Sequence, residues 1–432
     1  MQRNRFLGDL LSQLFDRRGI MRGKEDQRDI YMLCGALLSA EGEVSGLRLA
    51  SSILARYVRL NGKEKLAFFR YLNADLEIDA ANVAKLATAY TADQSPALFI
   101  QLCQAAEPRR QELLRRLNQP FGATQLLVAM RVDLLTFLKD HPDLARTNLD
   151  FIHLLRSWFN RGLLVLKQIY WDTPARILDK IVAYEAVHQI DDWDDLRRRL
   201  YPPDRRCFAF FHPSMPDEPL IFVEVALTTE IPGSIDALLS DKRTPLDADQ
   251  AKVAVFYSIS NCQKGLTGIS FGNLLIKQVV AELSLECPNI DTFVTLSPIP
   301  LMTRWLETLT DDNDLKLAAK SVLEGTARSD TVRALAAKYL LTAKQSAGLP
   351  YDPVARFHLG NGAEVHDVHA GADTSENGQA QSRGAMVNYL YNVDHTERNH
   401  ESFAMRSTVT ASRNVQALST AKPDVKTKEP AS

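Results

Sequence analysis

The hydrophobic pattern of this chain changes near residue 160, and the change predicts two kinds of architecture in one molecule. Before that point, apolar residues recur every fourth position, on one face of a helix, and the clearest stripe is Leu126, Met130, Leu134 and Leu138. After it, the chain has short runs rich in aromatic and β-branched residues, which are typical of strands, at 207–211, 220–227, 253–260 and 292–296.

Length and composition fit this division. The 432 residues exceed the usual size of one domain, and a chain with 45% hydrophobic and 24% charged residues is typical of globular proteins. The sequence therefore predicts a two-domain α+β protein, with a helical bundle over residues 1–160 and a mixed-sheet domain over 161–405. The last part of the chain is polar and loses periodicity, so we expect a disordered tail over 406–432.

Charge and cysteine usage argue against several classes of protein. The formal net charge is −2, which gives no reason to expect nucleic acid or an anionic membrane as a partner. The five cysteines are widely spaced and form no Cys-x-x-Cys pair, so a disulfide framework or zinc site is not expected and a reducing compartment is favoured. The sequence has no run of roughly 18 apolar residues and no signal-peptide core. We therefore expect a cytoplasmic protein.

The segment from Val253 to Leu296 has the pattern strand, glycine-containing loop, helix, strand, and it predicts where a ligand binds. If the strands are parallel, the loop and Ser297 lie at one carboxyl edge of the sheet, where open α/β sheets bind ligands. The loop precedes a helix whose first N–H groups suit a diphosphate. Its spacing matches neither the dinucleotide fingerprint nor a P-loop, so an ordinary strand–helix turn is an equal alternative.

Two side chains could carry chemistry, and each also has an ordinary structural interpretation. Ser297 precedes a proline, which keeps its backbone extended, but most such serines are surface turn residues. His358 lies beside a predicted turn, and a single histidine is usually structural. His366 and His369 have metal-like spacing but fall in a predicted polar loop over 362–384 without a third ligand, so we expect no metal site.

Six segments, in order along the chain, resemble the malonyl-CoA decarboxylase family. Six ordered matches are far more specific than any one of them. The segments are 184–188, 210–216, 256–260, 267–273, 296–300 and 357–363. The resemblance covers residues 150–400 well and the helical N-terminal part more loosely.

The resemblance implies a fold and a set of site residues. The family combines an N-terminal helical domain with a catalytic α/β domain similar to the GCN5-related acetyltransferase fold, and its members form tetramers. Its catalytic serine and histidine match Ser297 and His358, and a further serine and tyrosine near its site match Ser258 and Tyr391. The loop that binds the coenzyme A diphosphate in that fold matches Thr267, Gly268, Ile269, Ser270, Phe271, Gly272 and Asn273.

The resemblance also implies a reaction, the carboxy-lyase conversion of malonyl-CoA to acetyl-CoA and CO2 in fatty acid metabolism. Loss of CO2 leaves an enolate, which fixed donors in a dry site stabilise. We expect Ser297 to hydrogen-bond the carboxylate or the thioester oxygen, and His358 to protonate the α-carbon because imidazole can carry a proton near neutral pH. Which residue holds the carboxylate is open. The thioester stabilises the carbanion, so we expect no cofactor beyond the coenzyme A of the substrate.

Two other functions remain open on the sequence. An acyl-CoA-dependent acyltransferase on the same fold would need an acceptor pocket and a base. A non-catalytic scaffold would bind malonyl-CoA without turning it over. The apolar stripes of the helical part are broader than one small bundle needs, so we expect it to mediate self-association into a homo-oligomer.

Overall fold

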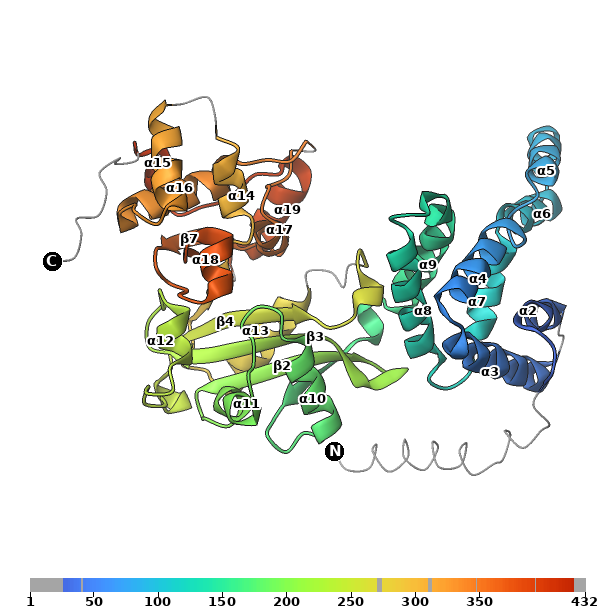
Figure 1. Cartoon of the computed structure of the whole chain (residues 1–432), viewed down its shortest axis with the longest axis horizontal. Helices are drawn as coiled ribbons and strands as arrows, with labels where there is room; N and C mark the ends of the chain where they lie inside the picture. The colour runs from blue at the N-terminus through green and yellow to red at the C-terminus, as the bar shows by residue number, and fades with distance from the viewer. Residues whose placement is uncertain are drawn as a thin grey trace. The chain divides into compact units, whose positions relative to one another are not determined.

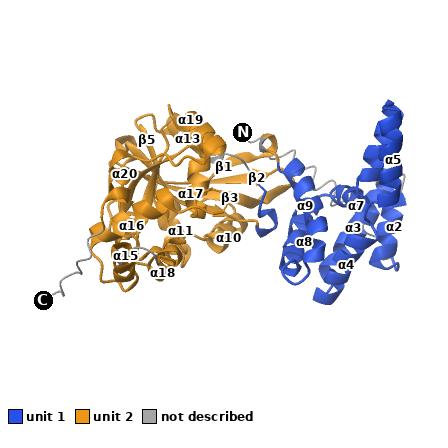
Figure 2. Ribbon diagram, turned by 90° about the horizontal axis from the view of Figure 1, so that it is seen from above, with its two compact units in different colours: residues 1–159, 264–270 blue, residues 160–263, 271–432 orange. Residues whose placement is uncertain are grey.

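The computed structural model describes residues 26–39, 42–269, 274–309, 313–346, 348–392 and 394–422. The chain divides into two compact units (Figure 2). Unit 1 comprises residues 1–159 and 264–270, and unit 2 comprises residues 160–263 and 271–432. The first boundary lies where the hydrophobic pattern changes. The segment 264–270 differs from expectation, because it packs with the helical unit although the sequence placed it within the second domain.

Unit 1 is helical in its described part. Its core is filled by large apolar side chains such as Phe68, Phe69 and Leu114, which are fully buried. In α8, Leu127, Met130 and Leu134 are buried in the core, whereas Leu126 of the predicted stripe is exposed. The helices are α2 (Ile30–Ser39), α3 (Glu43–Arg59), α4 (Gly62–Ala74), α5 (Ala80–Ala92), α6 (Pro96–Ala106), α7 (Arg109–Leu117), α8 (Ala123–Phe137) and α9 (Ala145–Trp158).

Unit 2 contains an eight-stranded sheet of order β1-β2-β3-β4-β5-β8-β6, with β7 paired to β8. β2, β3 and β4 lie side by side in it (Figure 1). β4 and β5 are parallel and the other pairs are antiparallel, so the expected mixed sheet is confirmed. The strands are β1 (Val165–Ile169), β2 (Arg205–His212), β3 (Met215–Thr228), β4 (Val253–Asn261), β5 (Thr292–Thr295), β6 (Ser297–Pro298), β7 (Glu364–His369) and β8 (Met386–Leu390).

Helices of unit 2 bury apolar side chains against this sheet. α10 and α11 pack on β3 and β2 (Figure 1), where Ile177, Leu178 and Ile181 join Ala209 and Phe222 in one core cluster. The helices are α10 (Ala175–Tyr184), α11 (Trp193–Leu200), α12 (Ile235–Leu239), α13 (Leu274–Glu286), α14 (Met302–Glu307), α15 (Asn313–Leu323), α16 (Ser329–Thr342), α17 (Pro353–Gly360), α18 (Glu376–Ser382), α19 (Thr396–Arg406) and α20 (Arg413–Thr420). None of the helices in the described ranges is long and apolar enough to span a bilayer.

Two segments that we expected to lack regular structure contain it. The predicted loop over 362–384 holds β7 and α18, so His366 and His369 belong to a strand. The imidazole of His369 is hydrogen-bonded, with Nε2 2.5 Å from Asn388 Oδ1. The tail predicted from residue 406 is also wrong up to residue 422, because α20 packs there and Val415 is fully buried. Residues 423–432 lie outside the described ranges.

Candidate active site

Ser297 lies where the two parallel strands of the sheet part. The ladder between β4 and β5 ends with Phe256 opposite Thr295. β4 continues along β3 to Asn261, whereas Ser297 begins β6 and pairs with β8. Ser297 therefore lies at the carboxyl edge of β5, the edge that the strand directions predicted. It is buried there.

His358 is positioned by a short helix with a well-formed start. The Asp352 carboxylate accepts hydrogen bonds from the N–H groups of Val354 and Ala355, each at 2.9 Å, and Pro353 occupies the first turn of α17, where its missing N–H costs nothing. One turn and a half later, His358 lies in the last turn of this helix and is buried. The histidine is therefore held by a helix, and the turn predicted beside it follows at residues 361–362.

The side chains of Ser297 and His358 meet, and each has a further partner. Ser297 Oγ lies 3.2 Å from His358 Nε2, and His358 Nδ1 lies 2.8 Å from the Tyr391 hydroxyl. Ser297 Oγ also donates to Thr295 Oγ1 at 2.8 Å. A hydroxyl has one proton, so a serine that donates to the threonine accepts from the histidine. This favours a neutral His358 that carries its proton on Nε2 and accepts from Tyr391 at Nδ1.

Aromatic rings enclose the imidazole. Tyr389 stacks on His358 with the ring centroids 4.6 Å apart and the planes 22° apart, and Phe357 and Tyr391 meet it edge-on. Burial lowers the pKa of His358 to about 3, because an imidazolium would lose its hydration there. The sequence analysis expected His358 to carry a proton near neutral pH. With this lowered pKa, the imidazole of His358 is instead neutral at rest.

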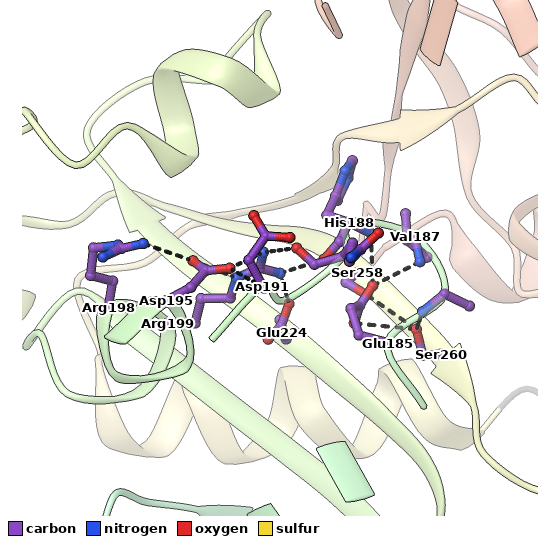
Figure 3. A network of polar contacts seen from close by, with 12 residues as sticks. Glu185, Val187, His188, Asp191, Asp195, Arg198, Arg199, Glu224, Ser258 and Ser260 are labelled. Carbon is purple, nitrogen blue, oxygen red and sulfur yellow. Dashed lines mark hydrogen bonds and ion pairs between the residues drawn. The ribbon is translucent and has the colours of Figure 1, made fainter. Parts of the chain in front are cut away.

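Ser258, which the resemblance placed near the site, has its hydroxyl directed at a carboxylate (Figure 3). Ser258 Oγ lies 2.8 Å from both oxygens of Glu185, and Ser260 donates to the same carboxylate at 3.3 Å. β4 is bulged at this point: Ser258 pairs with Glu224 while Phe256 pairs with the next residue of β3, so the residue between them has no partner in the ladder. No hydrogen bond joins Ser258 to Ser297 or His358 in the described structure.

The same polar network contains a buried ion pair (Figure 3). Arg199 donates to Glu224 at 3.3 Å and to Asp195 at 3.0 Å, and its terminal nitrogens also reach the carbonyl oxygens of His188 and Gln189 at 2.8 Å. Burial raises the pKa of Glu224 to about 8, with the nearby charge of Glu185 adding to the effect and Arg199 opposing it. These contacts brace the segment from Glu185 to Gln189 against β3 and β4.

The loop predicted to bind a diphosphate is described in part. Thr267, Gly268 and Ile269 lie within the described residues, and Ser270, Phe271, Gly272 and Asn273 lie outside them. Gly268 has φ +78°, a left-handed conformation that favours glycine. Gly265 has a different reason: a Cβ there would overlap the backbone oxygen of Val128 in α8. One of the glycines that suggested a ligand therefore serves close packing in unit 1.

Comparison with protein families shows which family this chain belongs to. The model of the malonyl-CoA decarboxylase C-terminal domain matches residues 162–429, more than half of the chain, and the model of the N-terminal domain matches residues 76–159. This chain belongs to the malonyl-CoA decarboxylase family. Membership of this family, a family of carboxy-lyases, agrees with the resemblance found in the six sequence segments.

Individual members of the family are similar over most of the chain. The mitochondrial malonyl-CoA decarboxylases of Anser anser anser and Rattus norvegicus are each 34% identical, over 71% and 74% of this chain and 69% and 72% of their own. The solved malonyl-CoA decarboxylase structures from Rhodopseudomonas palustris and Agrobacterium vitis are 50% and 47% identical, each with a TM-score of 0.84. The match to the first structure covers 90% of this chain and 98% of the other, and the match to the second covers 91% of this chain and 100% of the other.

Sequence reasoning missed two residues of this decarboxylase-family site, Thr295 and Tyr389. Both were within reach, because strand side chains alternate and a residue two positions from a site residue shares its face. Thr295 precedes Ser297 by two residues, and Tyr389 precedes Tyr391 by two. Within the described ranges, no group of three or more His, Cys, Asp or Glu side chains is arranged to hold a metal ion.

Proposed function

We propose that this chain converts malonyl-CoA to acetyl-CoA and CO2, with Ser297 and His358 as the residues that act on the malonyl group. Membership of the decarboxylase family supports the reaction. The observation that supports these two residues is the 3.2 Å contact between Ser297 Oγ and His358 Nε2 at the carboxyl edge of the sheet. A buried pair of hydrogen-bonding groups at a ligand-binding edge is suited to orienting a small polar group.

Loss of CO2 requires positioning and charge stabilisation. The bond between the α-carbon and the carboxylate breaks, its electron pair moves to the α-carbon, and the thioester carbonyl oxygen takes up the developing charge. A hydrogen-bond donor aimed at that oxygen lowers the barrier, most of all where water is excluded. The carboxylate must also be held out of the carbonyl plane. His358 Nε2–H supplies one such donor, and the Ser297 hydroxyl supplies a second when it turns from Thr295 to the substrate. Either of them can hold the carboxylate.

The enolate then needs a proton on its α-carbon. His358 is neutral in the resting site, so the donor is its Nε2–H or the Ser297 hydroxyl, which Nε2–H reprotonates. Tyr391 can replace the lost proton by donating to Nδ1, 2.8 Å away. The negative charge then rests on the Tyr391 oxygen until solvent returns a proton. Burial raises the pKa of Tyr391 above its ordinary value, but a thioester enolate is more basic still.

The function is tested with malonyl-CoA alone in heavy water. We expect acetyl-CoA that carries deuterium in its methyl group, because the hydroxyl and imidazole protons of the site exchange with the heavy water and a deuteron then replaces CO2 on the α-carbon. An acyl-CoA-dependent acyltransferase would leave malonyl-CoA unchanged without an acceptor, and a scaffold would bind it saturably without product. Either result would reject the proposed reaction.

The two proposed residues are tested by Ser297→Ala and His358→Ala. Loss of an oxyanion donor lowers kcat by about 100- to 1000-fold, and we expect losses of this order for both variants. Ser284→Ala and His153→Ala are matched controls, because both side chains are exposed and neither belongs to the site. Turnover near that of the unmodified chain in either site variant would remove that residue from the mechanism.

We further propose that the reaction needs no metal or organic cofactor, because the thioester of the substrate already stabilises the carbanion. Dialysis against a strong chelator is therefore expected to leave kcat unchanged, and a loss that added metal restores would contradict this.

The molecular setting is also a proposal. We infer a homo-oligomer, a tetramer by family resemblance, and a cytoplasmic role in fatty acid metabolism with malonyl-CoA as the main partner. The five free cysteines fit a reducing compartment. The curated relatives are named as mitochondrial, so a fluorescent fusion observed in cells is the direct measurement.

A further inference from the structure

Unit 1 contains a buried arginine with an unusual set of partners. Arg131 of α8 is 1% exposed. Its terminal nitrogens donate to the carbonyl oxygens of Gly265 at 2.7 Å and Thr267 at 2.9 Å, and its Nε donates to Asn148 Oδ1 at 3.0 Å. All three of these hydrogen bonds go to neutral oxygens, and two of those oxygens belong to the short segment 264–270.

The other buried arginines show what Arg131 lacks. Among the described residues there are three of them, and each has a carboxylate within 3.7 Å, in the pairs Arg110–Asp150, Arg199–Asp195 and Arg205–Asp204. Within the described residues, Arg131 forms no ion pair with a carboxylate. Burial lowers the pKa of Arg131, and the positive charge of Arg156 adds to this effect. A buried charge without a counter-charge is costly, so an anion bound near Arg131 would offset part of that cost.

The segment that Arg131 holds is the one expected to meet a diphosphate. The Thr267 carbonyl points at the guanidinium, and the peptide to Gly268 is trans, so the Gly268 N–H points the opposite way. Gly268 is exposed, and its N–H makes no hydrogen bond to another backbone group of the described residues. A peptide whose carbonyl binds a cation has a more strongly polarised N–H, because hydrogen bonds in a chain reinforce one another.

We propose that Arg131 makes this loop a recognition element for the diphosphate of the substrate, as a positioning residue of the helical unit. It fixes the Thr267–Gly268 peptide with its N–H outward and adds a positive charge behind it. The inference rests on the proposed function, which gives the substrate a coenzyme A tail, and extends it by assigning a role in tail recognition to unit 1. The exposed donor and the uncompensated cation together match a nucleoside diphosphate, which carries several negative charges.

The test compares two thioesters in the same enzyme preparation. Malonyl-pantetheine has the malonyl group and pantetheine arm of malonyl-CoA but lacks the nucleotide and its phosphates. For Arg131→Met, we expect kcat/KM to fall about tenfold for malonyl-CoA, the effect of weakening the hydrogen bond from the Gly268 N–H to a charged phosphate, and to change less than about twofold for malonyl-pantetheine. Because the two values come from one preparation, partial unfolding of the variant cancels in their ratio.

Two further variants separate charge from geometry. Arg131→Lys keeps the charge but loses the planar fork that reaches both carbonyl oxygens, so an intermediate loss specific to malonyl-CoA is expected. Arg156→Gln removes a nearby positive charge from an exposed side chain that has no hydrogen bond to the loop, and it should leave the ratio unchanged. Equal losses for both thioesters in Arg131→Met, no loss for either, or the same selective loss in Arg156→Gln would overturn the inference.

A binding measurement keeps this inference separable from the proposed reaction. Titration calorimetry with free coenzyme A and with pantetheine needs no turnover. A weaker coenzyme A affinity in Arg131→Met, with pantetheine binding unaltered, supports the role of Arg131 even if malonyl-CoA is not decarboxylated. An unaltered coenzyme A affinity contradicts that role even if the decarboxylase reaction is found.

Discussion

At the scale of single residues, the Ser297 hydroxyl is oriented from two sides. Thr295 Oγ1 accepts a hydrogen bond from the Ser297 hydroxyl at 2.8 Å, and His358 Nε2 lies 3.2 Å from the Ser297 oxygen. Thr295 is itself fully buried, and its Oγ1 also accepts the N–H of Tyr389 at 3.1 Å. A buried hydroxyl with these partners keeps one rotamer, so the threonine determines which lone pair of Ser297 is presented to the histidine.

Replacing Thr295 by valine keeps the shape of the side chain and removes the acceptor. Ser297 is then free to donate to His358, which reverses the hydrogen bond between them, and we expect kcat to fall about tenfold with little change in KM. Thr295→Ser keeps the hydroxyl and should retain most of the activity. Steady-state kinetics with malonyl-CoA measure both effects. Equal kcat in the valine variant and the unmodified chain would show that Thr295 has no part in orienting the serine.

Glu224 predicts a pH effect on stability. Its pKa is raised to about 8 in the fold from an ordinary 4.5, so the folded chain holds this proton more tightly than the unfolded chain does. The stabilisation from the neutral carboxyl is complete below pH 4.5 and is lost as the pH rises towards 8, by up to about 1.4 kcal/mol per pH unit.

Glu224→Gln removes this titration, so its free energy of unfolding should rise relative to that of the unmodified chain as the pH goes from 5 to 8. Urea unfolding at several pH values measures the difference. Glu282→Gln, which changes an exposed carboxylate, should show no such trend. A difference between the Glu224 variant and the unmodified chain that does not depend on pH would contradict the raised pKa.

At the scale of elements, strands with continuous apolar runs could be predicted from the sequence, and β7 could not. Val365 and Val368 of β7 are both fully buried although they are three positions apart. The register shifts between Val365 and Asp367, so the intervening residue is bulged and alternation fails. Such a bulge is set by the partner strand and is not visible in a local pattern. α18 could not be predicted either, because its residues are polar and the contact of Gly378 with Asp373 is not visible in a local pattern.

The candidate site was predictable to different degrees. Strand direction alone placed Ser297 at the correct edge, but only the family resemblance paired it with His358, since 61 residues separate the two. Neutrality of the imidazole could not be predicted, because it follows from burial among rings that come from other elements. The resemblance placed Ser258 near the site, but it did not predict the hydrogen bond of its hydroxyl to Glu185, which no local pattern reveals.

At the scale of the whole molecule, the two units are not two continuous stretches of the chain. The connection from β4 to α13 contributes residues 264–270 to unit 1, where Gly265 packs on α8 and Arg131 binds two of its carbonyl oxygens. A helical unit that served only for assembly would have no need to hold this loop. The proposed roles of the helical unit are therefore two, recognition of the substrate tail through α8 and self-association through another surface.

The hairpin of α5 and α6 is the surface that best fits self-association. The two helices contact each other, and neither contains a buried residue, although their sequences are largely apolar. Phe99 and Ile100 are 52% and 54% exposed. Because water disfavours an apolar helix surface of this extent, we expect a second copy of the chain to cover it.

The double variant Phe99→Ser/Ile100→Ser should therefore lower the mass measured by light scattering. Leu285→Ser should not lower it, although Leu285 is an equally apolar and more exposed side chain of unit 2. A monomeric unmodified chain, or an unchanged mass in the double variant, would show that the hairpin is not the assembly surface.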